Sequence, residues 1–451
     1  MKHALLSASI LVAASTAAFA FQPADQPRNE PRDRAKARQP MTRPDSTGRE
    51  RTMTPARPTA RMQELLDELT ALEPKPIETL TPAQARKQPT FNDAVKAWLK
   101  KHKDQAPPKT PEEVADVDDM RYELAAGADG NAIQEGAVLG AGKEKIRIYK
   151  PLAARDADKN KLWPVIVYWH GGGFVAGDLD TYDSSCRALA NASGCIVASA
   201  EYRKAPENPF PAAANDAVAA YRWVLAHARE FNGDPANVSV AGESAGGNLA
   251  AVVCLSAKTL RFQMPTHQLL IYPVVQDSLD TPSARTYANA KPLSRAMMPW
   301  FLGHYAQSAA EKTDARGDDA PPPAMKTRAP DAPAPDWRMF PLYAPDHSGL
   351  PPTTIVLAEI DPICSDGEMY GDALRSSGVP VRQRRFAGVT HEFFGLGAVL
   401  PEAREAVAWA AEGVVGFDRE TGEAGHRTPA PDRPAPDRPM RDRRPDNNPA
   451  R

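Results

Sequence analysis

The chain has 451 residues, a formal net charge of −2 and a hydrophobic content of 42%. This near-neutral charge excludes an overall field that would favour nucleic acid or an acidic membrane surface, and the hydrophobic content is sufficient for a folded core. Proline is frequent, at 45 residues against a usual share of ~5%, and its distribution indicates where folded structure ends.

The N-terminal residues 1–20 have the pattern of an export signal. Lys2 and His3 precede an apolar stretch, and Ala18-Phe19-Ala20 has the small-x-small form of a signal peptidase site. The stretch is short for a spanning helix. We therefore expect a cleaved signal peptide and an exported protein, periplasmic or secreted, with no stable membrane insertion after cleavage; an uncleaved anchor is the alternative.

Three further segments are rich in proline and charge and poor in large apolar side chains: 21–60, about 311–338, and 418–451. Such segments bury too little surface to offset the entropy of ordering, so we expect a disordered linker, a flexible insertion and a disordered tail. Docking of the basic terminal segments to an anionic envelope surface is an alternative. The folded domain is predicted to span 61–417.

Within this domain, helix-like and strand-like patterns alternate. Apolar residues spaced by three and four predict amphipathic helices at 62–73 and 91–102. Strand-like runs then occur at 145–149, 165–169, 195–202, 238–242, 268–273, 353–359 and 381–386, and helical runs at 184–193, 212–231, 245–258, 366–377 and 402–415. Strands that are apolar throughout and separated by helices indicate an α/β fold with a mostly parallel central sheet covered on both faces.

The first motif, "HGGGF" at 170–174, follows the strand-like run "VIVYW". Glycine adopts positive φ without penalty and allows close backbone approach. The three glycines fit either a tight turn or a loop whose bare N–H groups face a developing negative charge.

The second motif, "GESAG" at 242–246, places Ser244 between a strand-like and a helical run. This context is typical of a nucleophile elbow, a sharp turn that presents the serine hydroxyl. The alternative is a helix N-terminus that is capped by the serine.

A serine nucleophile needs a base and an orienting carboxylate. His391, in "GVTHEFFG", follows the last strand-like run and is the best candidate for the base. Among the acidic residues of "AEIDPICSDG", Asp361 comes where the chain leaves a strand, while Glu359 belongs to the strand end and Asp366 is expected to cap the next helix. Asp361 is therefore the predicted carboxylate, and the order Ser244, Asp361, His391 is that of α/β-hydrolases.

With a serine nucleophile predicted, the glycine loop "HGGGF" can be interpreted as part of an oxyanion hole. A tetrahedral intermediate carries negative charge on the former carbonyl oxygen, and N–H groups of the glycine loop and of the residue after the nucleophile can bind it. We predict an oxyanion hole formed by Gly172, Gly173 and Ala245.

Five segments together resemble the hormone-sensitive-lipase-like, or GDXG, group of α/β-hydrolases: "HGGGF", "YRKAPENPFPAA" (202–213), "GESAGGNLA" (242–250), "IDPICSDG" (360–367) and "THEFFG" (390–395). The resemblance implies hydrolysis of small acyl or acetyl esters without metal or organic cofactor. It also implies a helical cap, which the runs at 62–102 and 295–306 fit. The insertion at 311–338 departs from the family pattern.

Two other functions are compatible with this fold, since fold alone does not fix function: a peptidase or amidase, and a non-catalytic protein that binds a small ligand. The four cysteines are expected to be buried small residues, although export would permit pairing. The natural ester and the oligomeric state cannot be read from the sequence.

Overall fold

The structure is a computed structural model, and it describes residues 54–103, 116–124, 142–155, 157–306 and 334–416. All of these belong to one compact unit. The predicted signal peptide, most of the predicted linker, most of the insertion and the C-terminal tail lie outside the described residues.

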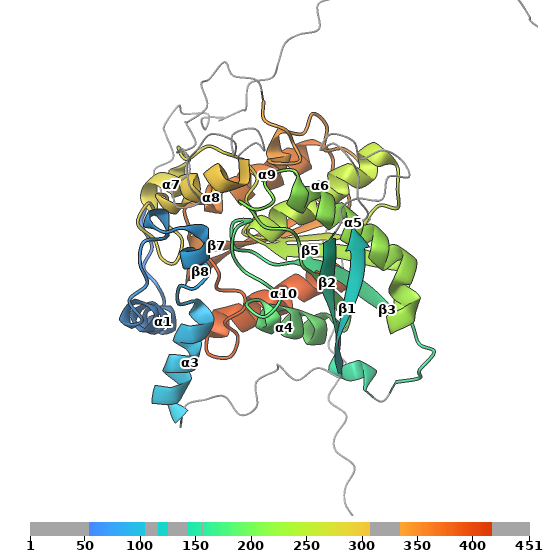
Figure 1. Ribbon diagram of the computed structural model, residues 1–451, viewed down its shortest axis with the longest axis horizontal. Coiled ribbons are helices and arrows are strands. Elements are labelled where there is room, and N and C mark those ends of the chain that lie inside the picture. Colours follow the sequence, from blue (N-terminus) through green and yellow to red (C-terminus); the bar gives the residue numbers. More distant parts are fainter. Residues whose placement is uncertain (1–53, 104–115, 125–141, 156, 307–333, 417–451) are drawn as a thin grey trace, which may run out of the picture. The chain divides into compact units, whose positions relative to one another are not determined.

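A single sheet dominates the described part of the chain, with the strand order β1-β2-β4-β3-β5-β6-β7-β8 (Figure 1). The strands are β1 (Asp116–Leu124), β2 (Gly142–Lys150), β3 (Trp163–Trp169), β4 (Ile196–Ala200), β5 (Gly233–Glu243), β6 (Gln268–Ile271), β7 (Thr353–Ile360) and β8 (Val381–Thr390). From β4 to β8 neighbouring strands pair in parallel, whereas β1 and β2 pair antiparallel. The predicted α/β class and mostly parallel sheet are confirmed.

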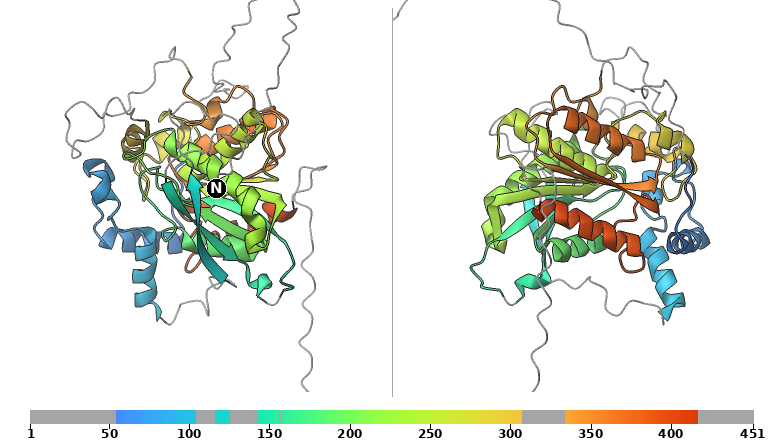
Figure 2. Two further views of the ribbon diagram at one scale, coloured as in Figure 1. Left: turned by 45° about the vertical axis from the view of Figure 1, so that its right-hand side comes forward. Right: turned by 180° about the vertical axis from the view of Figure 1, so that it is seen from behind.

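Helices cover both faces of this sheet, as seen from the front and from behind (Figures 1 and 2). One face carries α4 (Asp183–Ser193) and α10 (Pro401–Gly416). The other carries α5 (Ala212–His227), α6 (Ala245–Leu260) and α9 (Cys364–Ser376). Parallel strands need such crossover helices, so the two layers follow from the alternating pattern of the sequence.

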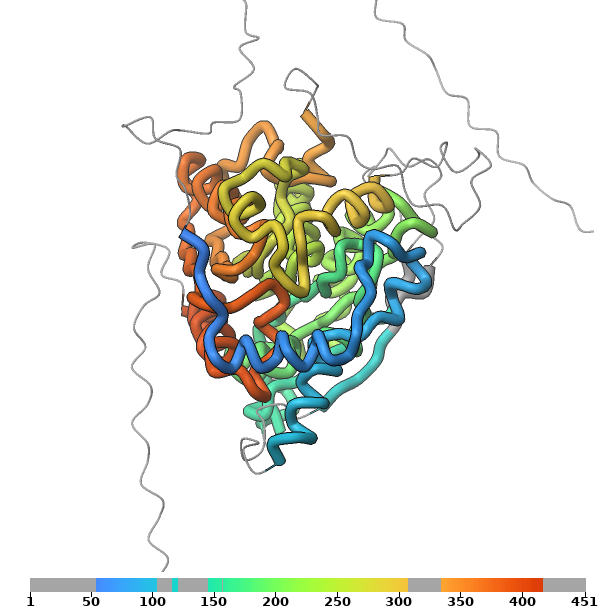
Figure 3. The backbone as a smooth tube through the Cα atoms, turned by 90° about the vertical axis from the view of Figure 1, so that its left-hand side faces the viewer, coloured from blue at the N-terminus to red at the C-terminus, as the bar shows by residue number. Residues whose placement is uncertain are grey.

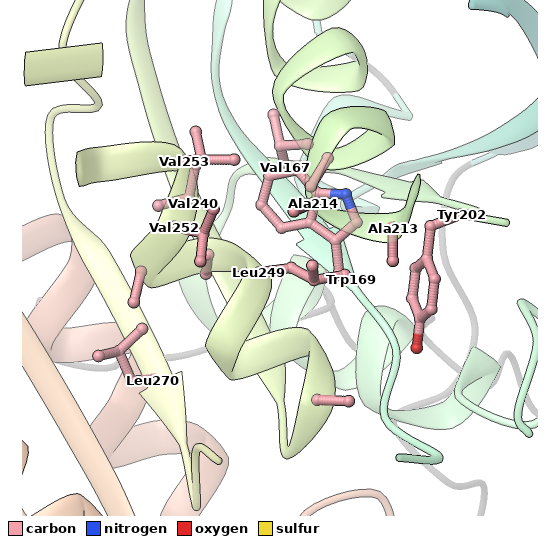
Figure 4. Packing of buried hydrophobic residues seen from close by; sticks show 14 of the residues in the cluster. Val167, Trp169, Tyr202, Ala213, Ala214, Val240, Leu249, Val252, Val253 and Leu270 are labelled. Carbon is pink, nitrogen blue, oxygen red and sulfur yellow. The ribbon is translucent and has the colours of Figure 1, made fainter. Parts of the chain in front are cut away.

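The pleat of the central strand β3 divides the core into two clusters. Val165, Val167 and Trp169 face the α5–α6 side, and Ile166 and Tyr168 face the α4–α10 side. Figure 4 shows the first cluster, in which Val167 and Trp169 pack beside helix residues such as Leu249. Because both faces are buried, the strand is a continuous apolar run rather than an alternating one.

Two separate parts of the chain form a cap near the carboxyl ends of the sheet. The N-terminal part contains α1 (Ala60–Ala71), η1 (Ile77–Thr79), α2 (Pro82–Ala85) and α3 (Phe91–Lys101), and the later part contains α7 (Pro282–Thr286) and α8 (Met297–Ala306). Figure 3 shows α1 and α3 against the rest of the fold, with α1 crossing close to the C-terminal segments. Thr59 N–H donates to the carbonyl of Gly388 at 2.9 Å, which fixes the start of α1 to β8.

No helix in the described ranges combines the length and apolarity needed to cross a bilayer.

Candidate active site

Ser244 lies at the sharp turn between β5 and α6. Its backbone has φ 55° and ψ −114°, outside the regions that most residues adopt. The turn is possible because of its flanking glycines: a Cβ on Gly242 would clash with the backbone of Gly246, and a Cβ on Gly246 would clash with the carbonyl of Trp169 in β3. The sequence pattern thus forms the predicted nucleophile elbow.

The three predicted triad residues meet at one end of the sheet. Asp361 follows β7 and His391 follows β8 directly. His391 Nε2 lies 3.0 Å from Ser244 Oγ, and His391 Nδ1 lies 2.7 Å from Asp361 Oδ2. All three side chains are buried. In this arrangement Nδ1–H donates to the carboxylate, which leaves Nε2 as acceptor for the serine hydroxyl.

Opposing effects act on the His391 imidazole. Burial disfavours its charged form, but the charge and hydrogen bond of Asp361 outweigh burial, so the pKa of His391 is raised above its ordinary value. Asp361 is itself held by a hydrogen bond from the Ile363 N–H at 3.0 Å. A raised pKa helps the imidazole to accept the serine proton.

The predicted oxyanion-hole residues lie around the same place. Gly172 and Gly173 have φ of 99° and 60°, and both line the cavity that also contains Ser244 and His391. Ala245 is the first residue of α6, where N–H groups have no acceptor within the helix. A Cβ on Gly173 would clash with the ring of Phe301 in α8, so this glycine also permits the cap to pack on the loop.

His170 supports the glycine loop through contacts on both sides of its ring. Its ring stacks on Tyr202 with centroids 4.4 Å apart, and its Nδ1 lies 2.7 Å from the Gly171 carbonyl. The Glu201 carboxylate is 3.6 Å from Nε2. Burial alone would raise the pKa of Glu201, but contacts with His170 and Lys204 hold this pKa at about 2.

One prediction about the neighbouring acidic residues is wrong. Asp366 does not cap α9, which begins at Cys364 with Ile363 as its N-cap residue. Its buried carboxylate instead accepts a hydrogen bond of 2.8 Å from Gln276 Nε2. Burial raises the pKa of Asp366 well above its ordinary value. The cap was expected because Asp is frequent at such positions, and the tertiary contact could not be seen in the sequence.

Sequence reasoning also missed a buried network behind the nucleophile. The Glu243 carboxylate accepts hydrogen bonds from the hydroxyls of Tyr168, at 2.5 Å, and Tyr272. The Tyr272 ring in turn packs on the ring of His391, with centroids 4.6 Å apart. Glu243 was visible as the variable residue of the "GESAG" motif, but its two tyrosine partners lie on β3 and after β6.

Ser244 and His391, two of the predicted triad residues, line a cavity of about 620 Å³. Its walls combine the sheet end with both parts of the cap. The apolar side chains that line it come mainly from the cap: Leu69, Ile77, Phe91, Leu293, Met297, Met298, Phe301 and Leu302. The expectation that 62–102 and 295–306 contribute to a cap over the site is in keeping with this lining.

The four cysteines are free and buried. Among the residues that the structure describes, no group of His, Cys, Asp and Glu is arranged to hold a metal ion.

Comparisons with known proteins agree with this geometry. A family model described as the alpha/beta hydrolase fold matches residues 166–395. Esterase LipI of Mycobacterium tuberculosis is 38% identical over 266 residues, which are 59% of this chain and 76% of LipI. An ethyl acetate hydrolase of Pseudomonas putida is 31% identical over 268 residues, covering 59% of this chain and 76% of that enzyme.

The solved structure of a hyperthermophilic esterase from the archaeon Pyrobaculum calidifontis superposes with a TM-score of 0.61 at 30% identity, and the match covers 80% of this chain and 98% of that one. The fold, the site and these relatives lead to one assignment. The chain belongs to the hormone-sensitive-lipase-like family of α/β-hydrolases and is a carboxylic ester hydrolase.

Proposed function

We propose that this chain is an exported serine carboxylesterase that hydrolyses small acyl esters through Ser244, His391, Asp361 and an acyl-enzyme intermediate. The observation that carries the proposal is the line of hydrogen bonds from Ser244 Oγ to His391 Nε2, at 3.0 Å, and from His391 Nδ1 to Asp361 Oδ2, at 2.7 Å. This arrangement converts a weak hydroxyl nucleophile into an activated one.

In the first half-reaction, Ser244 Oγ attacks the ester carbonyl carbon while His391 Nε2 accepts the hydroxyl proton. The carbonyl oxygen becomes an oxyanion, which the N–H groups of Gly172, Gly173 and Ala245 are proposed to stabilise. His391 then gives its proton to the leaving alkoxide, and the tetrahedral intermediate collapses to an acylated Ser244 and a free alcohol.

In the second half-reaction, water replaces the alcohol. His391 accepts a proton from the water as it attacks the acyl carbon, and the same imidazole returns that proton to Ser244 Oγ when the acid leaves. Asp361 keeps the imidazole in the required tautomer and stabilises its charged form during both steps.

Preference for small esters is supported by the cavity, whose volume of about 620 Å³ is shared between acyl and alcohol parts. The name of one relative, an ethyl acetate hydrolase, is in keeping with a short acyl chain. Export is supported by the basic start, the apolar stretch and the Ala18-Phe19-Ala20 site at the N-terminus.

The experiment compares p-nitrophenyl acetate, butyrate and octanoate with an aminoacyl anilide, using wild type and Ser244→Ala. We expect turnover of the short esters, with a burst of p-nitrophenol equal to the enzyme present, and a loss on the order of 10⁴-fold or more in the variant. Retention of more than a few per cent of activity by a folded Ser244→Ala would disprove the assignment of Ser244 as the nucleophile.

Preferential cleavage of the anilide would favour a peptidase or amidase. Export is tested separately, by N-terminal sequencing of protein from the culture medium and periplasm.

A further inference from the structure

An acidic side chain lies next to the base in the active-site cavity. Glu392 follows His391 directly, and its side chain lines the same cavity as Ser244. Its backbone φ of 64° is in the left-handed region, which an L-residue with a side chain rarely adopts. The charge of Glu392 contributes to raising the pKa of His391, in keeping with a carboxylate that lies near the imidazole.

The surroundings of Glu392 differ from those of the other acidic residue near the nucleophile. Glu243 is buried behind the site and accepts hydrogen bonds from two tyrosine hydroxyls. Glu392 is only partly buried, and it accepts a long hydrogen bond of 3.5 Å from Tyr182 Oη. Burial raises the pKa of Glu392, and the His391 charge and the Tyr182 hydrogen bond oppose this rise. A carboxylate offers about four lone-pair sites, so Glu392 keeps capacity to accept from a molecule in the cavity.

The basic side chains along the cavity are engaged away from Glu392 or are exposed. Arg86 makes two hydrogen bonds of 2.7 Å with Glu207, and Lys204 donates to the Gly177 carbonyl and to Glu201. Lys75 and Lys291 lie on the exposed rim, where solvent and salt screen their charge. The imidazole charge that develops on His391 is stabilised first by Asp361, which is hydrogen-bonded to Nδ1, and Glu392 adds a further interaction with this charge.

The direction of the reaction places one part of the substrate next to Glu392. His391 must reach the leaving oxygen in order to protonate it, so the alcohol part of the ester lies on the imidazole side of the cavity. The cap residues Met297, Met298 and Phe301 that line the same cavity are apolar. An alcohol group that extends past His391 is therefore expected to lie beside the Glu392 carboxylate.

We infer that Glu392 is a specificity-determining residue that binds a cationic nitrogen in the alcohol part of the substrate. The substrate class is esters of amino alcohols, including quaternary ammonium alcohols. A carboxylate in a partly desolvated cavity attracts such a cation more strongly than it would in water. This inference rests on the proposed esterase function and adds the substrate class to it.

The test uses two esters of equal shape and different charge, 2-(trimethylammonio)ethyl acetate and 3,3-dimethylbutyl acetate. Both give the same acetyl-enzyme, so a difference in kcat/KM reports acylation and not the later hydrolysis. We expect wild type to prefer the cationic ester on the order of tenfold. In Glu392→Gln and Glu392→Gly this preference is expected to disappear; the second variant also relieves the backbone strain at φ 64°.

Glu78→Gln is the matched control, because Glu78 is a carboxylate that lines the cap wall of the same cavity; its variant should keep the wild-type preference. Equal kcat/KM for the two esters in wild type, or an unchanged ratio in both Glu392 variants, would overturn the inference while leaving the esterase proposal intact. A fall in kcat/KM by the same factor for both esters, with the preference for the cationic ester kept, would assign Glu392 to positioning of His391 and would also overturn it. Hydrolysis of neither ester, nor of p-nitrophenyl acetate, by wild type would overturn the proposed function and the inference with it.

Discussion

At the scale of single residues, contacts with neighbouring atoms hold the backbone of Ser244 in its strained conformation. At φ 55° and ψ −114°, the serine is held by its own N–H, which donates to the Ile271 carbonyl at 2.9 Å, and by the close contacts of Gly242 and Gly246. Strain of this kind costs about 1–3 kcal/mol and persists only where the surroundings impose it. The hydroxyl is thereby presented to His391 before any substrate binds.

The pH dependence of kcat/KM should report His391. The imidazole must be neutral to accept the serine proton, so kcat/KM is expected to rise as the pH increases through the His391 pKa. Since Asp361 raises this pKa above its ordinary 6.5, the acid limb should lie above that value. In Asp361→Asn the raising contribution is lost and burial remains, so the limb should move to lower pH while kcat falls about 10⁴-fold.

This prediction is checked by steady-state kinetics with a neutral ester between about pH 5 and 9. An acid limb that stays in place when Asp361 is replaced would contradict the assigned contact between its carboxylate and His391.

The two glycines of the predicted oxyanion hole should respond differently to substitution. A Cβ on Gly173 meets the Phe301 ring, whereas a Cβ on Gly172 meets the backbone carbonyl of Ala176. Both Ala variants should lose activity by about 100- to 1000-fold, the usual cost of losing an oxyanion donor. Adding Phe301→Ala should restore part of the activity of Gly173→Ala and none of Gly172→Ala, as measured by kcat; restoration of neither would contradict the assigned clash with Phe301.

At the scale of elements, the sequence predicts the central strands well, because strands buried on both faces are continuous apolar runs. It does not predict β1, whose sequence "DVDDMRYEL" is acidic and which pairs with β2 at the edge of the sheet. The triad and glycine loop are predicted because each follows a strand end. Glu392, Tyr182 and Phe301 are not, because their roles arise from contacts between elements far apart in the chain.

Helix α6 packs so closely on β3 that a side chain at position 246 should not fit between them. A Cβ there clashes with the carbonyl of Trp169 and would lie 2.7 Å from that of His170, both in backbone that cannot move easily. We expect Gly246→Ala to lower the free energy of unfolding by about 3 kcal/mol. Gly397→Ala is the control, since its Cβ would lie an ordinary 3.5 Å from Arg404, and it should change stability by less than about 0.5 kcal/mol.

Urea denaturation of the three proteins measures these differences. Equal midpoints for Gly246→Ala and Gly397→Ala would show that α6 does not approach β3 as closely as the structure indicates.

At the scale of the whole molecule, stability and substrate binding share the same cap. Leu69 and Phe91 line the cavity, and their helices α1 and α3 are joined through Trp98. This side chain is buried, and its Nε1 donates to Glu64 at 2.8 Å. The cavity wall therefore depends on packing that lies outside the cavity.

Replacing Trp98 by Ala should lower the free energy of unfolding by about 3–5 kcal/mol, the usual cost of truncating a large buried aromatic side chain. It should also raise KM for small esters, because α1 and α3 no longer hold their cavity residues in place. Thermal unfolding and steady-state kinetics measure both effects. The exposed Leu152 offers a control, and an effect of Trp98→Ala no larger than that of Leu152→Ala would contradict this role.

The four buried thiols have a practical consequence. Burial raises their pKa values, that of Cys195 to about 11, so almost no thiolate is present in the native protein at neutral pH. An alkylating reagent such as iodoacetamide should therefore leave the folded chain unmodified and label the cysteines only when the protein unfolds. The rate of labelling then measures the rate of unfolding without denaturant or an added chromophore.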